Sequence, residues 1–580
     1  MGPHVAVLLA IAFIASTVNA NSIPSCDSPI YCQGNLLHTI QMARLFPDSK
    51  TFVDMQQKHP AQVTLQNFNQ LMKDKKDNPS REDLIKFVND NFESTGELVD
   101  WTPPDLNKNP SFLKRIDDLR VKAFAKGLVN VWPKLARKVS DSVKEHTDQH
   151  SLIHLPNGFI IPGGRFKEIY YWDSYWIVEG LLVSEMTETV RGVLENFLSI
   201  VERFGFIPNG SRVYYLNRSQ PPLLAMMMGK YIDQTGNKTW LEKHVDTLEK
   251  EMNWWWSERK ITVKKDGANY DMFMYAVKSD TPRPESYYED IVTCQNFTES
   301  EKKVCYRNLK SGAESGWDFS TRWLYNDDRT PSTNLSQIDI INVVPVDLNA
   351  FLCKAFEELS RFYQLIGNNE KAEAWSHKQL NLRSAIQAIN YNDEDGIWYD
   401  FDVNYSTHRK EFYPSNFAPL WADAYDTTKK ETFGIRAATY YKKMKVPSYA
   451  GGIPTSLIQS GQQWDMPNAW PPIQEFVVLG LRKTGSKKAE RLAKSEAKKI
   501  VEAYMTGFET TKDMFEKYDA RHPGEYGGGG EYVVQTGFGW ANGEALTLIN
   551  EFYAKSHKKH RKHRKSSSHQ RHEKQRNNDV

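Results

Sequence analysis

The chain has 580 residues, of which 40% are hydrophobic and 12% aromatic, and this composition is adequate for a large buried core. No segment contains about 18 uninterrupted apolar residues, which excludes a membrane-spanning helix. Because no Gly/Ser-rich or Pro-rich linker divides the chain internally, residues 21–554 are predicted to form one large domain.

Residues 1–20 have the pattern of a secretory signal peptide. Residues 6–14 are apolar but too few to cross a bilayer, and Val18, Asn19 and Ala20 precede the expected cleavage point. The positive charge ahead of the apolar run is weak. The alternative interpretation is a buried helix or strand at the amino terminus.

The five cysteines fit an exported protein. Cys26 and Cys32 are close in sequence, as are Cys294 and Cys305, and each pair could close a small disulfide loop. Cys353 would then be free, and we expect it to be buried. The pairing itself is not observable from the sequence.

Six Asn-x-Ser/Thr sequons also point to the secretory pathway. The candidates for glycosylation are Asn237, Asn296, Asn334 and Asn404. The other two sequons, at Asn209 and Asn217, lie in a motif that is assigned below to the functional site. Glycosylation is therefore not expected at those two positions.

Most of the domain is predicted to be helical. Apolar residues recur at three- and four-residue spacing in residues 112–139, 177–204, 347–365, 370–389, 472–481 and 487–506. Strand-like alternation is sparse, although residues 158–161 and 212–216 are expected to pair locally. Many helices joined by loops that carry the motifs favour a helical toroid, and no clear internal repeat is visible.

The carboxy-terminal segment, residues 555–580, is strongly basic. It holds ten of the 74 Lys and Arg and two of the 72 Asp and Glu, so 64 basic and 70 acidic residues remain and give the rest of the chain a formal charge of −6. The tail has no apolar periodicity and is predicted to be disordered. Two interpretations stay open: weak contact with an anionic surface, or a solvated and dispensable tail. Because the amino terminus indicates export, we expect no nucleic-acid partner.

Residues 162–176, PGGRFKEIYYWDSYW, bring aromatic rings, charged side chains and a Gly-Gly turn together. Aromatic rings stack on the apolar faces of a pyranose, and carboxylates and guanidinium groups hydrogen-bond its hydroxyls. Residues 463–472, QWDMPNAWPP, have the same character. The two stretches therefore predict a sugar-binding site.

Both stretches resemble the signature motifs of the trehalase family, glycoside hydrolases that split α,α-trehalose into two glucoses. The resemblance spans about residues 32–553 and continues in FIPNGSRVYYLNRSQPP (206–222), PRPESY (282–287), ESGWDFSTRW (314–323), MFEKYD (514–519) and GGGGEYVVQTGFGWANG (527–543). It implies an all-α fold, an (α/α)6 barrel with short local strands in the active-site loops and a pocket at one rim. Residues 21–554 would then be a single catalytic domain.

Glycosidic cleavage usually needs two carboxyl groups, one of which delivers a proton to the leaving oxygen. Asp318 lies between Trp317 and Phe319, where partial desolvation favours the protonated form that a general acid needs. The resemblance places the family's catalytic acid at Asp318. The alternative from local context is an aspartate that caps a helix.

The resemblance places the catalytic base at Glu516. Lys517 and Asp519 are charged neighbours, so we expect a polar environment that keeps the carboxylate ionised. Without the resemblance, a surface glutamate on a helix is the ordinary interpretation. The resemblance also implies an inverting reaction in which Glu516 activates water, with the two carboxyl groups about 6.5–9.5 Å apart.

The motifs also supply predicted sugar contacts. A guanidinium group can grip adjacent hydroxyls or hold a neighbouring carboxylate ionised, and the resemblance implies that use here. Taken singly, each arginine would be a structural ion-pair partner and each tryptophan a core residue. The predicted contacts are Arg165, Trp172, Asp173, Asn209, Arg218, Gln220, Arg283, Glu285, Gly316, Trp464, Asp465 and Glu531.

Residues 527–530 are four consecutive glycines followed by Glu531. The run lacks the Lys-Ser/Thr of a P-loop and the spacing of a dinucleotide fingerprint. It is predicted to be a mobile lid with Glu531 turned towards the sugar, and a flexible surface loop is the alternative. The motifs contain no metal-ligand spacing, and acid–base hydrolysis of an acetal requires no cofactor, so neither a metal nor another cofactor is expected.

The sequence thus predicts a secreted, extracellular α,α-trehalase that acts on a small-molecule substrate, trehalose. The basic tail stands where a membrane-anchored form would carry a hydrophobic segment, which favours the soluble form. The alternatives are an inactive sugar-binding relative, a related glycosidase with a different glucoside, and a surface-binding protein that acts through the tail. Retention of Asp318, Glu516 and the three arginines argues against inactivity.

Overall fold

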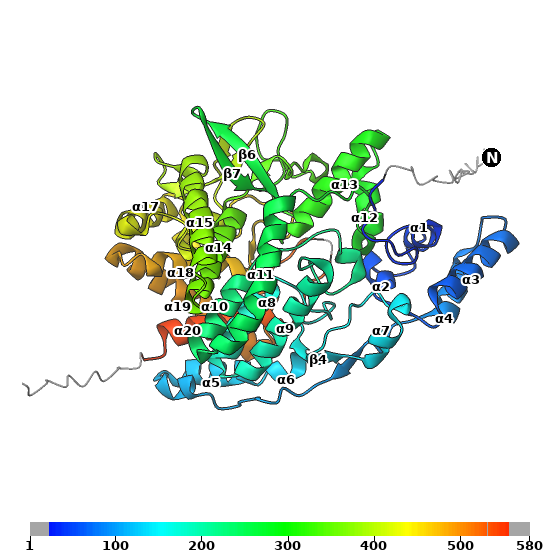
Figure 1. Cartoon of the computed structure of the whole chain (residues 1–580), viewed down its shortest axis with the longest axis horizontal. Helices are drawn as coiled ribbons and strands as arrows, with labels where there is room; N and C mark the ends of the chain where they lie inside the picture. Colours follow the sequence, from blue (N-terminus) through cyan, green and yellow to red (C-terminus); the bar gives the residue numbers. More distant parts are fainter. Residues whose placement is uncertain (1–21, 531, 556–580) are drawn as a thin grey trace, which may run out of the picture.

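The computed structural model describes residues 22–530 and 532–555, and most of these residues are helical (Figure 1). The predicted signal peptide, residues 1–20, lies outside the described residues, as do residues 556–580 of the basic tail. None of the helices in the described part of the chain is long and apolar enough to span a bilayer.

Six helical segments form a closed inner ring. They are α8 (Asp173–Val183), α10 (Leu224–Thr235), α14 (Val346–Leu365), α16 (Ala418–Trp421), α18 (Pro471–Lys483) and α20 (Gly539–Phe552). Each segment contacts the next, and α20 returns to contact α8. Helices α8 and α20 are buried on almost every side, as their nearly continuous run of apolar and small residues predicts.

Six further helices form an outer ring. They are α5 (Leu119–Val129), α9 (Thr187–Phe204), α11 (Lys238–Glu258), α15 (Asn369–Ile389), α17 (Lys430–Lys443) and α19 (Lys487–Thr511). Each packs against an inner helix and buries one apolar face, as α9 does with Val190, Leu194 and Val201. Outer and inner helices alternate along the chain, so the fold is the predicted (α/α)6 barrel.

Most of the predicted helices occur where the periodicity placed them, as α14, α15, α18 and α19. Residues 177–204 do not form one helix, because the chain turns at Glu185, which has a φ of 62°, between α8 and α9. Residues 112–139 break into η1 (Ser111–Arg115), α5, α6 (Trp132–Leu135) and β4 (Ala136–Val139). The break before α6 follows from Pro133, which suits a helix start and not a helix interior.

The two segments predicted to pair locally do so to different extents. Residues 158–161 contain β5 (Phe159–Ile160), which pairs with β4. Residues 212–216 pair locally through Arg212, which forms an isolated antiparallel bridge with Leu152. The rest of the segment is a 3₁₀ turn, η3 (Val213–Tyr215), because Tyr214 and Tyr215 are both buried and strand alternation would turn one of them outwards.

The remaining elements lie outside the two rings. The helices are α1 (Asn35–Met42), α2 (Ser49–Val53), α3 (Ala61–Asp74), α4 (Arg81–Asn91), α7 (Asp141–Glu145), α12 (Tyr287–Cys294) and α13 (Glu299–Glu314). The strands of the small antiparallel sheets are β1 (Gln56–Gln57), β2 (Phe92–Glu93), β3 (Leu98–Asp100), β6 (Lys260–Lys265), β7 (Ala268–Phe273), β8 (Val343–Val344), β9 (Tyr391–Asn392), β10 (Ile397–Trp398), β11 (Asp400–Asp402), β12 (Thr407–Arg409), β13 (Asn468–Ala469) and β14 (Tyr518–Asp519).

The amino-terminal helices α1 to α4 cover one side of the barrel (Figure 1). Their apolar residues form a second hydrophobic cluster, separate from the main core, that reaches Tyr170, Tyr214 and Tyr215 of the barrel loops. This region therefore packs against residues of the motifs at 162–176 and 206–222.

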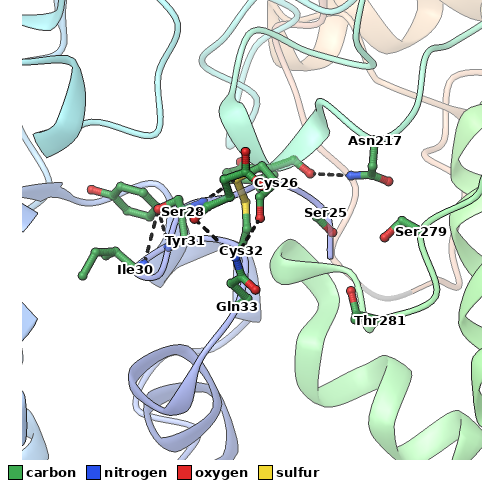
Figure 2. Close-up of a disulfide and its surroundings, with 12 residues drawn as sticks. Ser25, Cys26, Ser28, Ile30, Tyr31, Cys32, Gln33, Asn217, Ser279 and Thr281 are labelled. Atoms are coloured by element: carbon green, nitrogen blue, oxygen red, sulfur yellow. Dashed lines mark hydrogen bonds between the residues drawn. A yellow bond between two sulfur atoms is a disulfide. The ribbon is translucent and has the colours of Figure 1, made fainter. Parts of the chain in front are cut away.

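Both disulfide pairings considered from the sequence are present. Cys26 is bonded to Cys32 (Figure 2) and Cys294 to Cys305, while Cys353 is free and buried. The first bridge closes a turn near the start of the described chain, and the second joins α12 to α13. Of the glycosylation candidates, Asn296, Asn334 and Asn404 are exposed, and Asn237 is half-buried at the start of α11.

Candidate active site

The motifs meet at one end of the barrel because of how the chain alternates. Residues 162–172 lead into α8, residues 206–222 into α10, residues 463–470 into α18 and residues 514–538 into α20. Each outer helix returns the chain to the same end before the next inner helix begins. The amino-terminal ends of the inner helices, with their unpaired N–H groups and positive dipole ends, therefore share one rim.

A cavity of ≈ 100 Å³ lies among these loops. Its lining includes the predicted residues Arg165, Trp172, Asp173, Asn209, Arg218, Gln220, Arg283, Glu285, Gly316, Asp318, Trp464 and Glu516. Asp465 does not line this cavity, and Glu531 lies outside the described residues. The fold thus brings both proposed catalytic carboxyl groups to one cavity.

Asp318 lies in the loop after α13 and is half-buried. No helix of the described chain begins there, so Asp318 is not a helix cap. The second signature supports its loop: Gln463 Nε2 donates to the Asp318 carbonyl oxygen over 2.6 Å, and the Trp464 N–H donates to the Phe319 carbonyl oxygen over 3.0 Å.

Glu516 is 1% exposed and lies in a turn before β14, not on a surface helix. Burial raises the pKa of its carboxyl group, whereas Lys517, the Tyr532 hydroxyl and the Gln535 N–H lower it. Tyr532 Oη donates to Oε1 over 2.7 Å, and the Gln535 N–H donates to Oε2 over 3.1 Å. The polar environment expected from the sequence consists of these hydrogen bonds and the Lys517 cation, which favour the ionised form, while burial opposes it.

Asp173 is a third carboxyl group in the cavity, at the first position of α8. Burial raises its pKa well above the usual range, and repulsion from Glu516 and Asp318 raises it further. A raised pKa favours the protonated form of a carboxyl group, which can donate a hydrogen bond as well as accept one. Asp173 could therefore contact a sugar hydroxyl either as a hydrogen-bond donor or as an acceptor.

The three predicted arginines all line the cavity, and each has a carboxylate partner. Arg165 Nη2 lies 3.0 Å from Asp48, and its guanidinium group lies 4.7 Å from the centre of the Tyr532 ring. Arg283 forms a buried pair with Asp290 at 2.7 Å. The structural ion-pair interpretation and a place in the cavity are thus compatible for both arginines.

Arg218 differs because part of its side chain lacks a partner. Its Nη2 lies 2.7 Å from Glu285 Oε1, but its Nε and Nη1 and the second oxygen of Glu285 have no hydrogen-bond partner within the described residues. All three atoms are buried, and unpaired buried polar atoms are costly. Hydroxyl groups of a bound sugar would satisfy them.

Tryptophan rings form the apolar wall. Trp464 stacks on Trp470 with ring centres 4.0 Å apart and an interplanar angle of 1°, and Trp172 lies 5.6 Å from Trp464. Gly316 has a φ of 76°, and a Cβ there would lie 2.8 Å from Trp172. Glycine is therefore required for Trp172 to reach its place.

Asp465 departs from the predicted sugar contacts. Its carboxylate accepts hydrogen bonds from Ser320 Oγ at 2.9 Å, from the Thr321 N–H at 2.8 Å and from Thr321 Oγ1 at 2.9 Å. It therefore braces the loop that follows Asp318, and its acceptor positions are occupied by protein donors. We do not retain Asp465 among the sugar contacts.

Sequence reasoning missed several cavity residues. Tyr532 and Gln463 lie inside the quoted motifs, so the motifs themselves were a signal for them. Tyr215 also lines the cavity and lies inside residues 206–222, another quoted motif. Lys50 is a further lining residue, and nothing in its local sequence singles it out. Within the described residues, no group of three His, Cys, Asp or Glu side chains could hold a metal ion.

Comparison with known proteins agrees with the geometry. The model of the Trehalase family matches residues 44–553. The chain is 51% identical over 549 residues to a trehalase from Tenebrio molitor, which covers 94% of this chain and 99% of that protein. It is 42% identical over 532 residues to a human trehalase, which covers 91% of this chain and 90% of that protein.

The fold is also similar to that of a solved structure, the neutral trehalase Nth1 from Saccharomyces cerevisiae. The TM-score is 0.54 at 23% sequence identity, over 69% of this chain and 74% of that chain. At this level of identity the similarity concerns the fold alone.

Proposed function

The chain belongs to the trehalase family, and on that premise we propose that it hydrolyses α,α-trehalose outside the cell by an inverting acid–base mechanism. The observation that carries the proposal is the single cavity lined by Asp318, Glu516 and three arginines. An inverting glycosidase needs one carboxyl group that gives a proton and another that takes one from water.

Asp318 is the proposed general acid. It protonates the oxygen that bridges the two glucose units, and the bond from that oxygen to the anomeric carbon breaks. Its half-buried position between Trp317 and Phe319 supports the role, because an acid must hold its proton until the substrate arrives. The hydrogen bond from Gln463 to the Asp318 backbone limits movement of the group.

Glu516 is the proposed general base. It takes a proton from a water molecule that attacks the anomeric carbon from the opposite face, so one product is α-glucose and the other β-glucose. The Tyr532 and Gln535 donors support the ionised form that this role requires. The separation of the two carboxyl groups, expected at about 6.5–9.5 Å, stays a prediction.

The sugar contacts are proposed from the lining of the cavity. Arg218 and Glu285 offer unpaired donor and acceptor atoms, Asp173 offers a carboxyl group, and the Trp172 and Trp464 rings offer apolar faces. The cavity volume of ≈ 100 Å³ is well below the roughly 300–1,000 Å³ of typical ligand pockets. We therefore also propose that residues 527–530 move as a lid when trehalose enters.

Export is proposed on separate grounds. The Cys26–Cys32 and Cys294–Cys305 disulfides are typical of proteins that fold in an oxidising compartment. Exposed sequons at Asn296, Asn334 and Asn404 also suit the secretory pathway. Removal of residues 1–20 stays a prediction, which mass spectrometry of the secreted protein would test. The role of the basic tail, residues 555–580, as a weak contact with an anionic surface or as a solvated segment, also stays a prediction.

The decisive test is trehalose hydrolysis by the purified protein, followed by proton NMR of the first-formed anomers, with Asp318→Asn as the control. Equal initial α- and β-glucose, lost in the control, is the expected result. Two α-glucose products at the earliest times would overturn the role of Glu516. A folded protein that releases no glucose from trehalose but acts on another glucoside would overturn the substrate.

A further inference from the structure

Lys517 connects parts of the active site that are far apart in sequence. Its side chain is fully buried, and its ammonium group donates to Gln463 Oε1 over 3.2 Å and to the Gly529 carbonyl oxygen over 3.1 Å. Both acceptors are neutral oxygens. A buried ammonium group is costly unless its surroundings compensate for the loss of water, so its presence beside Glu516 requires an explanation.

One branch of the network leads from Lys517 to the proposed acid. Gln463 accepts from Lys517 through Oε1 and donates through Nε2 to the Asp318 carbonyl oxygen over 2.6 Å. The Gln463 backbone carbonyl is held in turn by Asn468 Nδ2 at 2.8 Å and by Trp470 Nε1 at 2.7 Å. A shift of Lys517 would therefore reach Asp318 through one side chain.

The other branch leads to the glycine run. The Gly527 N–H donates to the Lys517 carbonyl oxygen over 3.1 Å, while Lys517 Nζ donates to the Gly529 carbonyl oxygen. Asn468 accepts from the Gly528 N–H over 2.8 Å and donates to the Gly528 carbonyl oxygen over 2.7 Å. Lys517 and Asn468 thus hold the backbone of residues 527–529 by hydrogen bonds.

The glycines allow this close docking. A Cβ at Gly527 would lie 2.1 Å from Asn468 Oδ1, and one at Gly530 would lie 2.7 Å from Gln463 Oε1. Neither position accepts a side chain unless the network moves. The four glycines therefore let the segment lie directly on the Gln463, Asn468 and Lys517 side chains, as well as giving it freedom to move.

We infer that Lys517 is a positioning residue that couples the seating of residues 527–530 to the placement of Asp318 and to the charge of Glu516. The inference rests on the proposed function. When the glycine segment is seated, the ammonium group has both of its carbonyl-type acceptors and stands beside both catalytic carboxyl groups. When the segment lifts, one acceptor is lost and the alignment of Asp318 through Gln463 loosens.

The electrostatic surroundings of Lys517 support this role. Burial lowers the pKa of its ammonium group to about 8, while the carboxyl groups of Glu516 and Asp318 are the charged groups that raise it. Below that pH the positive charge favours the ionised form of Glu516. As the pH rises through about 8 the charge is lost, and the hydrogen bonds to Gln463 and Gly529 are no longer charge-assisted. The alignment of Asp318 through Gln463 weakens, so we expect kcat to fall on the alkaline side.

The test compares Lys517→Met with Lys499→Met. Lys499 also donates to two backbone carbonyls, at Pro447 over 3.2 Å and Tyr449 over 2.9 Å, and it pairs with Glu496 at 2.7 Å. None of these partners belongs to the network around Gln463 and the glycine run. We expect Lys517→Met to lower kcat on the order of 10²-fold with a smaller change in KM, and Lys499→Met to leave both unchanged. A Lys517→Met enzyme with kcat within about threefold of the wild type would overturn the inference.

A second variant keeps the test decisive if Lys517→Met does not fold. Gln463→Glu leaves Lys517 in place and puts a carboxylate at its acceptor, but it also removes the Nε2 donor to the Asp318 carbonyl oxygen. We therefore expect kcat to fall and its alkaline limb to move to higher pH. An alkaline limb at the wild-type position in Gln463→Glu would overturn the inference. Absence of trehalose hydrolysis in the wild type would instead overturn the proposed function, so the two failures are distinguishable.

Discussion

The Tyr532 hydroxyl lies 2.7 Å from a Glu516 carboxylate oxygen, so the segment that follows the four glycines places a donor on the proposed base. Burial raises the pKa of the Tyr532 phenol well above its usual range, and the nearby charge of Glu516 raises it further. Tyr532 therefore stays protonated and donates across the working range of the enzyme.

Tyr532→Phe removes this donor without removing the ring that packs on Arg165. Because the hydrogen bond favours the ionised carboxylate, its loss raises the pKa of Glu516 above a value that burial has already raised. The acidic limb of kcat/KM should move to higher pH, with activity at low pH reduced by about tenfold or more. Tyr526→Phe, at an exposed tyrosine of the same loop region, is the control, and an unmoved acidic limb in Tyr532→Phe would contradict the assignment.

Asp318→Asn and Glu516→Gln should each lower kcat by roughly 10²–10⁴-fold while the thermal unfolding midpoint stays near that of the wild type. Both substitutions keep the shape of the side chain and remove its ability to exchange a proton. Glu525→Gln is a matched control, since Glu525 is exposed and lies nearby in the chain. Near-normal turnover in either carboxamide variant would remove that residue from the catalytic pair.

The helices of the barrel could be predicted from the sequence wherever a single helix carried one apolar face. Residues 347–365 and 370–389 match α14 and α15 almost to the residue, because long amphipathic helices leave a strong periodic signal. The signal failed at residues 112–139, where β4 pairs with β3 and β5. That pairing depends on residues distant in the chain, which a local window does not contain.

The candidate site could likewise be predicted only in part from the sequence. The motifs identified the residues that line the cavity, because aromatic and charged side chains are concentrated there. They did not reveal that Asp465 faces Ser320 and Thr321, or that Asn468 holds Gly528. Those contacts join segments separated by 60 to 145 residues, so a side chain's partner emerges only in the folded chain.

Gly316→Ala should destabilise the protein and disturb the tryptophan wall. An alanine at a φ of 76° costs about 1 kcal/mol in backbone strain, and its Cβ would lie 2.8 Å from Trp172. Gly205→Ala separates the two contributions, since Gly205 has a φ of 81° and open space around its Cβ position. We expect the free energy of unfolding to fall in both variants, and KM for trehalose to rise only in Gly316→Ala. An equal KM in the two variants would show that the fit against Trp172 is unimportant.

Asp465→Ala should lower both stability and turnover, although Asp465 does not line the cavity. The substitution leaves the Thr321 N–H and the hydroxyl groups of Ser320, Thr321 and Ser460 without their acceptor, and the free energy of unfolding should fall by about 3 kcal/mol. Because Ser320 lies two residues after Asp318, we expect kcat to fall more than KM changes.

Asp465→Asn is the informative comparison for this loop. The amide keeps one acceptor oxygen but turns an N–H₂ group towards donors, so it should recover part of the stability and part of kcat. Urea denaturation would measure the first quantity and initial rates at saturating trehalose the second. If Asp465→Asn raised KM strongly while leaving kcat and stability unchanged, Asp465 would have to contact the sugar after all, and the bracing role would be wrong.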